Sequence, residues 1–295
     1  MKRRFVTAGL ASIAAAAVLT AATPSHAQEL QVTGPLKGAP AVRGMRLYRE
    51  GRLELAPTVS ATLLNQYRHT YMVGARLNYN IKDWIAVGVW GAATFLSVTT
   101  YLTDQIDSVA PRDALTAINV NHTGTDPSKY GNAPFGDQTA KLSYMLAPQL
   151  TFIPFRGKLA IFNKIFVDAD FYAAAGAAFV GIQERADCGG GGQTPCSDPS
   201  SFTLQSKTKI APTFAVGFTF FPGNFWSIGL EYRATPFSWN RGGFDTRGSG
   251  TNGNFPDQKI DSQDDTFDFN QMVTISVGFY FDIANKFSTK PRISE

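Results

Sequence analysis

The stretch Phe269–Ile283 reads FNQMVTISVGFYFDI, and its side chains alternate in character almost without interruption. Hydrophobic residues occupy one parity and polar or small residues the other, with Gln271 as the single polar residue in the hydrophobic row. Successive side chains of a β-strand point to opposite faces. This pattern therefore predicts a strand with one apolar face and one polar face.

The same stretch resembles the terminal strand of bacterial outer-membrane barrels. In those proteins a polar residue, a glycine and two spaced hydrophobic or aromatic residues recur, and Ser276, Gly278, Phe281 and Ile283 match that pattern. The resemblance implies that these four residues form the assembly signal that the barrel-assembly machinery recognises. It also implies an integral protein of a bacterial outer membrane, in contact with outer-membrane lipid.

The N-terminus has the features of an export signal. A basic cluster precedes an apolar run from Phe5 to Ala22, and Ser25-His26-Ala27 forms a small-x-small cleavage site. We expect residues 1–27 to be a cleaved signal peptide. The alternative is a membrane anchor, since the run is about long enough to span a bilayer, but the run is rich in alanine rather than leucine.

Charge and hydropathy exclude two classes of protein. The formal charge is +4, and removing the three basic residues of segment 1–27 leaves 24 basic against 23 acidic residues. We therefore expect no nucleic-acid partner. After the signal no apolar run reaches the roughly 18 residues of a helical span. What remains is a soluble exported protein, such as a β-sandwich, or a transmembrane barrel.

Eight segments alternate with a period of two and are predicted to be strands. They are residues 52–63, 71–81, 84–96, 141–153, 165–180, 207–220, 226–235 and 269–283. Short links alternate with long ones along the chain, and the long ones cover 100–140, 181–206 and 236–267. This asymmetry is typical of outer-membrane barrels, whose short turns face the periplasm.

We therefore predict an all-β fold, an eight-stranded antiparallel up-and-down transmembrane β-barrel over residues 52–283. Residues 28–51 would form a periplasmic lead-in segment, and residues 284–295 a periplasmic tail. Either end could contact a periplasmic partner, although termini of this kind are commonly disordered.

The inward parity of the predicted strands carries charges of both signs in equal number. They are Arg52, Glu54, Arg76, Lys141, Asp168, Asp170, Lys209, Glu231, Arg233 and Asp282. Side chains can fill the interior of an eight-stranded barrel, so we expect these charges to pair and plug the lumen. The alternative is a narrow charge-lined pore for small solutes.

Aromatic residues gather near the predicted strand ends, where the girdles of a membrane barrel lie. At the outer rim this interpretation includes Tyr71, Tyr144, Phe237 and Trp239. The competing explanation is the general preference of aromatic residues for strands. The concentration at strand ends favours girdles.

A Leu-Ala-Pro or Ile-Ala-Pro triplet recurs inside three predicted strands and ends at Pro57, Pro148 and Pro212. Proline has no N–H to donate to a strand ladder, and an unpaired carbonyl is costly inside a bilayer. We therefore expect β-bulges or locally wide pairing at these positions.

Cys188 and Cys196 are the only cysteines, and they bracket a glycine-rich stretch in a long loop. An exported protein enters an oxidising compartment, so we expect a disulfide between them. Two cysteines without a nearby histidine make a poor metal site.

Residues for catalysis are few. After removal of the signal only His69 and His122 remain, and Thr70 or Ser97 could partner His69 in a surface lipid hydrolase. No nucleophile elbow or metal triplet accompanies them. The spacing of the loop aspartates misses the calcium-loop pattern; they are Asp104, Asp107, Asp261, Asp264 and Asp265. We expect no catalytic, cofactor or metal site.

The stretch Arg49–Tyr79, together with Ile81–Gly88, resembles the opening of a myxobacterial-type outer-membrane β-barrel family. The matching residues are Gly51, Arg52, Glu54, Asn65, Tyr67, Gly74 and Tyr79. Some members of that family are associated with gliding-motility machinery, and most have no assigned activity. Together with the expected plug, this predicts a non-enzymatic structural or interaction component of the cell envelope. Its long external loops would carry the function and meet envelope protein partners.

Overall fold

The computed structural model describes residues 49–109, 135–161, 165–196, 199–223, 225–248, 257 and 259–282. The chain divides into two compact units, Met1–Gly44 and Met45–Glu295, and every described residue belongs to the second. The expected signal peptide, most of the lead-in, His122, Ile283 and the tail lie outside the described residues.

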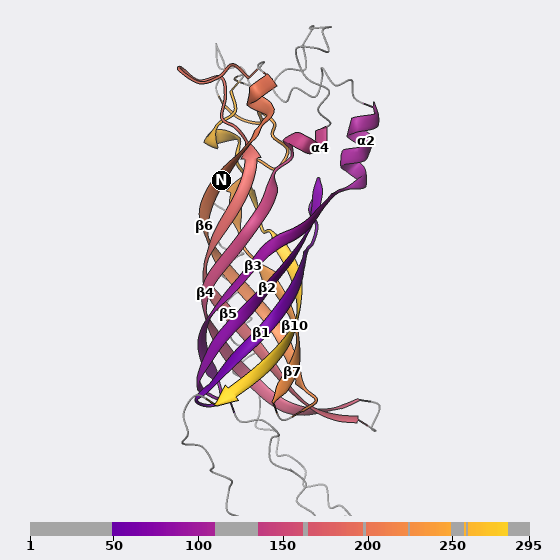
Figure 1. Ribbon diagram of the computed structural model, residues 1–295, viewed down its shortest axis with the longest axis vertical. Helices are drawn as coiled ribbons and strands as arrows, with labels where there is room; N and C mark the ends of the chain where they lie inside the picture. The colour runs from indigo at the N-terminus through magenta and orange to yellow at the C-terminus, as the bar shows by residue number, and fades with distance from the viewer. Residues whose placement is uncertain are drawn as a thin grey trace, which may run out of the picture. The chain divides into compact units, whose positions relative to one another are not determined.

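In the part of the chain that the structure describes, eight long strands close into a barrel (Figure 1). Their order around the ring is β1-β10-β7-β6-β5-β4-β3-β2, and every neighbouring pair is antiparallel. The strands are β1 Arg52–Thr62, β2 Arg68–Lys82, β3 Ile85–Thr99, β4 Lys141–Ile161, β5 Ile165–Arg185, β6 Leu204–Phe221, β7 Trp226–Ala234 and β10 Gln271–Asp282. The predicted all-β, eight-stranded up-and-down barrel is confirmed.

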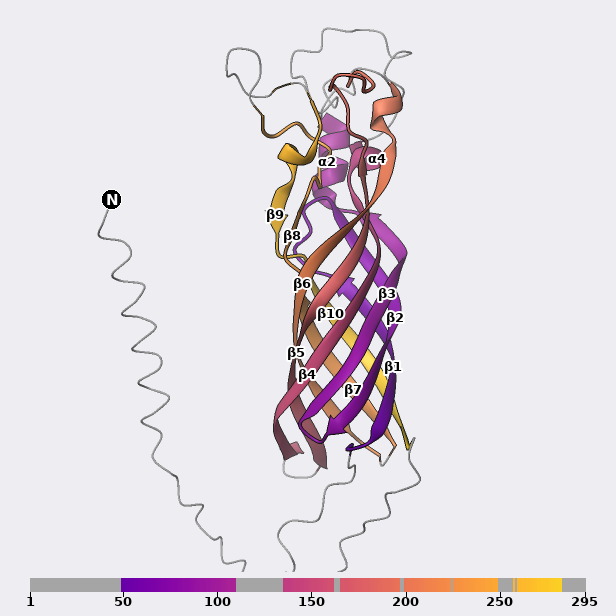
Figure 2. The ribbon, with the colours of Figure 1, turned by 90° about the vertical axis from the view of Figure 1, so that its left-hand side faces the viewer.

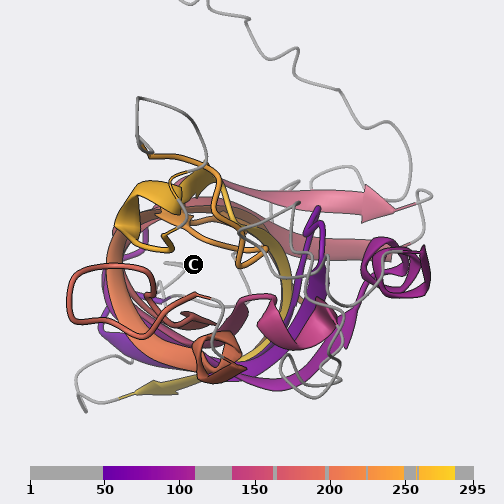
Figure 3. The same ribbon diagram turned by 90° about the horizontal axis from the view of Figure 1, so that it is seen from above.

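The first and last strands close the ring. β1 pairs with β10 from Arg52↔Asp282 to Thr62↔Met272. Seen from above, the strands form one ring, and segments from the long links lie over its opening (Figure 3). We call this end of the barrel the loop end, and the end with the short β2–β3 and β6–β7 connections the turn end.

The largest difference from the predicted strands lies between β4 and β5. Residues 154–164 were expected to be a link, but β4 continues to Ile161 and β5 begins at Ile165. β3 pairs with β4 only as far as Phe152, so beyond that point β4 pairs with β5 alone. The two strands leave the barrel at the turn end as a ribbon (Figure 1). A register shift between Phe152 and Phe155 breaks the alternation of side chains. The period-two pattern therefore did not predict the strand residues of the ribbon.

Short helices and strands lie at the loop end of the barrel (Figure 2). They are the helices α2 Tyr101–Val109 and α4 Phe135–Gln138, the 3-10 helices η2 Pro199–Phe202 and η4 Ser262–Asp264, and the strands β8 Phe237–Trp239 and β9 Thr266–Asp268. β8 and β9 pair with each other in a small separate sheet. Among the described residues, no helix is both long and apolar enough to cross a membrane.

Of the two expectations for the strand prolines, β-bulges or locally wide pairing, no bulge is found, but Pro57 and Pro148 each fall in a local gap in the pairing with one neighbouring strand. Pro57 pairs with Ala75 of β2 in unbroken register. On the other side, β1 pairs with β10 at Leu55 and again at Thr58 without a shift. No register shift falls at any of the three prolines. Each missing N–H is tolerated because the pairs on either side hold the register, so the interruption stays local.

Candidate functional site

The barrel interior holds a network of buried charges centred on Arg76. Its guanidinium donates Nη2 to Glu54 Oε1 at 2.8 Å, and Nη1 to Glu231 Oε2 at 3.1 Å and to the Tyr172 hydroxyl at 2.8 Å. The Tyr172 hydroxyl in turn donates to Glu231 Oε2 at 2.8 Å. These four side chains come from β2, β1, β7 and β5, so the network crosses the lumen rather than following its wall.

A second arginine extends the same network. Arg233 lies 2.8 Å from Glu231 Oε1, and it donates to Gln149 Oε1 at 2.8 Å and to Thr213 Oγ1 at 3.2 Å. Its guanidinium carbon is 4.4 Å from the centre of the Trp90 ring. Each buried charge therefore meets opposite charge and hydrogen-bonding partners, the condition under which buried ion pairs are tolerated. We call Glu54, Arg76, Tyr172, Glu231, Arg233 and Gln149 the lumen network.

The turn end of the interior holds a separate charged group, the floor, made of Arg49, Asp83, Arg156 and Asp170. Arg49 Nη2 lies 2.6 Å from Asp170 Oδ2, and the Arg49 backbone N–H donates to Asp83 Oδ1 at 2.9 Å. Arg156 bridges the same two carboxylates, at 3.0 Å from Asp83 and 3.4 Å from Asp170. Burial opposes ionisation of Asp83, but the Arg49 backbone N–H and the Arg156 guanidinium outweigh it and hold the pKa of this carboxyl below its ordinary value.

The sequence pattern does not point to Arg49, because this residue precedes the first strand and has no parity to assign. Its side chain is only 4% exposed, and its guanidinium also lies 5.5 Å from the centre of the Phe221 ring. Arg156 was missed because it falls in the stretch interpreted as a link. Both arginines come from segments where period-two patterning carries no information about direction.

Toward the loop end the interior is apolar. Buried side chains from six of the long strands and from β8 form one cluster, which we call the apolar layer: Met72, Trp90, Leu142, Met145, Val180, Ile182, Ala211, Phe237, Trp239 and Met272. Along β2, from the loop end toward the turn end, the buried side chains are Thr70, Met72, Arg76, Asn78 and Asn80, so Met72 lies on the loop side of Arg76. The apolar layer therefore lies between the lumen network and the loop end.

Two predictions about side-chain direction are wrong here. Phe237 and Trp239 were assigned to an outer girdle, but they are 6% and 3% exposed and pack in the apolar layer. Lys141 was assigned to the lumen, which would put its neighbour Leu142 on the outer face. Leu142 is instead 3% exposed and Lys141 is partly exposed, because a register shift between Leu142 and Tyr144 reverses the parity at the start of β4. A one-residue shift moves a side chain to the opposite face.

The remaining predicted lumen charges lie nearer the barrel ends. Asp282 pairs with Arg52 at 2.7 Å, but its side chain is 57% exposed, so its expected place in the lumen is wrong. Asp282 is the last residue of β10, so its side chain lies at the open end of the barrel rather than inside it. Lys209 bonds the Asp265 carboxylate and the Ser238 carbonyl at the loop end. Asp168 is buried near the floor, and Lys141 is partly exposed at the start of β4.

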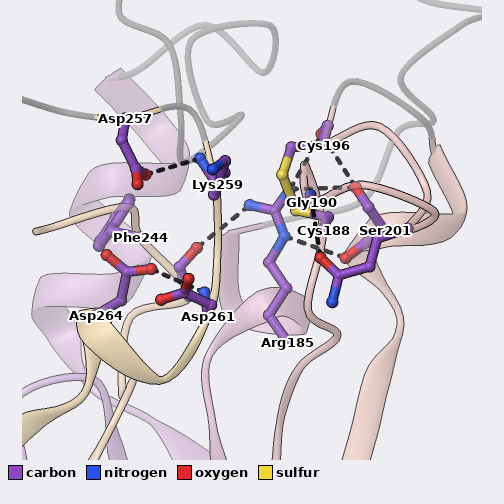
Figure 4. Close-up of a disulfide and its surroundings, with 12 residues drawn as sticks. Arg185, Cys188, Gly190, Cys196, Ser201, Phe244, Asp257, Lys259, Asp261 and Asp264 are labelled. Atoms are coloured by element: carbon purple, nitrogen blue, oxygen red, sulfur yellow. Dashed lines mark hydrogen bonds between the residues drawn. A yellow bond between two sulfur atoms is a disulfide. The ribbon is translucent and has the colours of Figure 1, made fainter. Parts of the chain in front are cut away.

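The loop end is organised around Arg185, as Figure 4 shows. Cys188 and Cys196 form a disulfide, and Arg185 Nη2 donates to the Cys196 carbonyl at 3.3 Å. The same guanidinium donates to the Ser201 carbonyl at 3.1 Å and the Gly243 carbonyl at 3.2 Å. It also lies 4.0 Å from the centre of the Phe202 ring. One buried side chain thus joins three loop segments.

The residues considered for catalysis do not come together. His69 is exposed on the outer face of β2, whereas its neighbour Thr70 is 2% exposed and exchanges hydrogen bonds with Thr62. Ser97 accepts a hydrogen bond from Arg68 on the inner side. Within the described ranges, no three His, Cys, Asp or Glu side chains lie close enough to hold a metal ion. Asp264 instead accepts hydrogen bonds from the backbone N–H groups of Thr246 and Asp261.

No protein-family model matches this sequence, and no curated protein is similar to it in sequence. Among solved structures, the chain is similar to the N-terminal β-barrel domain of Pseudomonas aeruginosa OprF, with 7% identity, 79% of this chain and 98% of that chain covered, and a TM-score of 0.38. It is also similar to the outer-membrane protein OprG from Pseudomonas aeruginosa, with 9% identity, coverage of 81% and 99%, and a TM-score of 0.38. Neisserial surface protein A shares 11% identity over 78% of this chain and 94% of its own, with a TM-score of 0.34. At such values no activity, partner or residue role is transferred.

Proposed function

We propose that this chain is an integral barrel of a bacterial outer membrane with a plugged lumen. It would act as a non-enzymatic structural or interaction component of the cell envelope through its loop end. In this arrangement the loop end faces the exterior and the turn end faces the periplasm. The observation that carries the proposal is the lumen network, which crosses the barrel beneath an apolar layer.

The outer face of the barrel supports the membrane location. Hydrophobic side chains on all eight long strands are between 40% and 57% exposed: Leu55, Val73, Leu77, Val89, Leu146, Leu150, Phe179, Phe214, Phe218, Leu230 and Ile275. A soluble protein rarely exposes apolar surface of this extent. A closed barrel satisfies its backbone hydrogen bonds internally, so it can present such a face to lipid.

The interior supports the plug. A hydrated ion moving along the lumen would meet the apolar layer, and hydrophobic constrictions in pores exclude water. It would also have to separate Arg76 from Glu54 and Glu231, and separating a buried ion pair leaves uncompensated charge at a cost of several kcal/mol. Both barriers favour the plugged barrel over the narrow pore.

Conductance of the refolded protein in planar bilayers tests the proposal. We expect no stepwise ion currents from samples whose gel mobility shows a folded barrel. Regular stepwise currents would overturn the plug and favour the narrow pore. A variant with Met72, Trp90 and Met272 changed to alanine removes much of the apolar layer but keeps the lumen network, and its conductance measures how much of the barrier the apolar layer supplies.

The lipid hydrolase is a lesser hypothesis, because His69 faces away from Thr70 and Ser97. If the purified protein released fatty acid from outer-membrane lipid, His69→Ala would decide whether this residue takes part. An unchanged rate in that variant would remove His69 from consideration.

The partners remain predictions. The resemblance to the myxobacterial-type family and its link to motility rests on the sequence alone, since no family model matches. Capture of cross-linked complexes from intact envelopes, with Cys188→Ser/Cys196→Ser as the loop-end variant, would identify envelope proteins that depend on this end. Recognition by the barrel-assembly machinery is tested separately through the closing strand.

A further inference from the structure

The ribbon formed by β4 and β5 leaves the barrel at the turn end and extends sideways, away from the barrel axis (Figure 1 and Figure 3). On one side β5 still pairs with β6 as far as Asp168↔Phe221. On the other side, β4 has no strand partner beyond Phe152 in the part of the chain that the structure describes. The change in direction follows the register shift between Phe152 and Phe155, where β4 has one residue more than β5, and such a β-bulge bends a strand.

One face of the ribbon is apolar along its length. It begins with Phe155, which is 69% exposed and whose ring centre lies 6.2 Å from that of Phe171. Residues paired across two strands share a face, and successive pairs alternate between the two faces. The pairs that follow Phe155↔Phe171 on its face are, by register, Gly157↔Ala169, Leu159↔Val167 and Ile161↔Ile165. These pairs contain only hydrophobic residues and one glycine.

The opposite face is more polar. Its pairs are, by register, Arg156↔Asp170, Lys158↔Asp168 and Ala160↔Phe166, so two of the three are charged. Arg156 also lies 3.0 Å from Asp83 in the floor. The ribbon is therefore amphipathic, and its charged face continues from the barrel interior.

The apolar face joins the outer wall of the barrel without a break. The Phe171 ring centre lies 5.2 Å from that of Phe218, an exposed residue on the outer face of β6. Phe152 and Trp84, also exposed, contact each other at the same end with ring centres 6.0 Å apart. A wall that bends away from the barrel axis turns its outer face toward the opposite end of the barrel. The apolar face of the ribbon therefore faces the level at which the outer wall would meet lipid.

The free edge of β4 limits how deeply this face can enter a bilayer. The Ile153 backbone N–H donates to the Trp84 carbonyl at 2.8 Å and forms the last link to the neighbouring wall. Residues 154–161 have no strand partner on that side within the described ranges. Open sheet edges do not occur in the hydrocarbon region, because no water is present there to satisfy their backbone groups. The headgroup boundary contains water, so the ribbon can lie there with its edge hydrated.

We propose that the ribbon is a membrane-surface element whose apolar face rests on the leaflet next to the turn end. The occupant of this face is the lipid bilayer, because the face continues the exposed apolar wall of the barrel. Amphipathic helices at membrane surfaces bury their apolar face about 5–10 Å into the boundary between headgroups and acyl chains, and the same balance applies to an amphipathic ribbon. This contact rests on the proposed function, since it requires the barrel to lie in a membrane.

Fluorescence quenching of the folded protein in phosphatidylcholine vesicles tests this inference. Cys188 and Cys196 form a disulfide, so one added cysteine is the single free thiol for an environment-sensitive fluorophore. Gly157→Cys places the label on the apolar face, where a Cβ atom meets nothing within 4 Å. Spin-labelled lipids carry the quencher either near the headgroup or near the end of the acyl chain. We expect the shallow quencher to act at least about twofold more strongly than the deep one on this label, as for a group at the headgroup boundary.

Two further positions calibrate the depth and separate this inference from the proposed function. Leu77→Cys places the label on the exposed outer face of β2 and should be quenched by the deep lipid, whereas Gln263→Cys labels an exposed residue of the loop end and should be quenched by neither. Weak quenching at residue 157 with normal quenching at residue 77 would overturn the membrane contact and leave the free edge of β4 for a strand of another protein. Stronger quenching at residue 157 by the deep lipid would also overturn it. Weak quenching at residue 77 would instead contradict the membrane barrel itself.

A pair of substitutions at Phe155 tests the apolar face directly. Phe155→Asp should lower the shallow quenching of the label at residue 157 at least about twofold, because a carboxylate favours water over the lipid boundary. Phe155→Leu keeps the face apolar and should leave this quenching unchanged. The label at residue 77 should be quenched equally in both variants, which shows that the barrel is folded and inserted. Equal quenching at residue 157 in the two variants would overturn the role of the apolar face.

Discussion

At the scale of single residues, the buried charges of the interior have several partners each rather than one. Glu231 accepts from Arg76, Arg233 and Tyr172, and its side chain is 1% exposed. Arg52 and Asp282 form a pair of similar length, but the Asp282 side chain is 57% exposed. The same type of contact therefore has different energetic weight at the two positions, because water screens only the second.

Glu231→Ala should lower the free energy of unfolding by about 3–5 kcal/mol, since it leaves two buried guanidinium groups without their shared carboxylate. Asp282→Ala should lower it by less than about 1 kcal/mol. Urea-induced unfolding in lipid vesicles, followed by tryptophan fluorescence, measures both. Equal effects at the two positions would contradict the assignment of Glu231 to a sealed network.

The contribution of Asp83 to the stability of the barrel depends on pH. Its folded-state pKa is lowered, so its contribution to stability is complete above the unfolded value of about 3.9 and disappears as the pH falls through the lower folded value. Asp83→Asn should therefore destabilise the barrel by roughly 1 kcal/mol at neutral pH, a figure reduced for partial exposure, and by almost nothing once the pH is below the lowered folded-state pKa.

The measurement is the urea midpoint of wild type and Asp83→Asn across the acid range. Asp282→Asn provides a control carboxylate at the same end of the barrel. If the difference in urea midpoint between wild type and Asp83→Asn increased toward low pH, the predicted direction of the pH dependence would be wrong.

At the scale of elements, β10 contains three of the four residues that were predicted as the assembly signal, and the fourth, Ile283, lies outside the described residues. Ser276 and Gly278 point inward and are buried, and Phe281 is 52% exposed on the outer face. A Cβ atom at Gly278 would come within 2.6 Å of Ser227 Oγ and 3.3 Å of Glu54 Oε1. The glycine therefore leaves room for the side chains of the neighbouring strands as the barrel closes.

Gly278→Arg should strongly reduce the amount of folded protein in the outer membrane, because the added side chain has no space in the closed barrel and adds a charge beside the lumen network. Gly191→Arg is the matched control, since a Cβ atom there meets nothing within 4 Å. Quantitative blotting of membrane fractions compares them, and normal levels of the Gly278 variant would count against the role of this strand.

Phe281→Asp should also reduce assembly, because it places a carboxylate on the face expected to meet lipid. Phe281→Leu keeps that face apolar and should assemble like the wild type. The same membrane fractionation compares the pair. If the aspartate variant reached wild-type levels, Phe281 would have no part in the assembly signal.

At the scale of the whole molecule, closure makes the barrel one cooperative unit. The first strand pairs with the last, so the ring cannot open at one edge without breaking pairs that join opposite ends of the chain. Unheated samples should therefore migrate differently from boiled samples on detergent gels. A soluble sandwich should need no detergent and show no such shift, and that result would contradict the membrane barrel.

The alternation of the sequence was sufficient to predict the eight strands, their antiparallel order and most side-chain directions. It was sufficient because a closed sheet with one apolar face imposes a period of two on every strand. It also identified Glu54, Arg76, Glu231 and Arg233 as inward charges. It did not reveal Arg49 and Arg156, because Arg49 precedes the first strand and Arg156 lies beyond the register shift of β4.

By itself, the sequence determined the barrel, its strand number and the charged character of its interior, because each of these follows from local periodicity. Only the tertiary structure decided which charges meet, that Arg49 pairs with Asp170, and that Phe237 and Trp239 pack inward in the apolar layer. Those contacts join residues far apart in the chain. Parity assigns a side chain to a face of its own strand, but packing across the barrel decides which groups from other strands and loops it meets there.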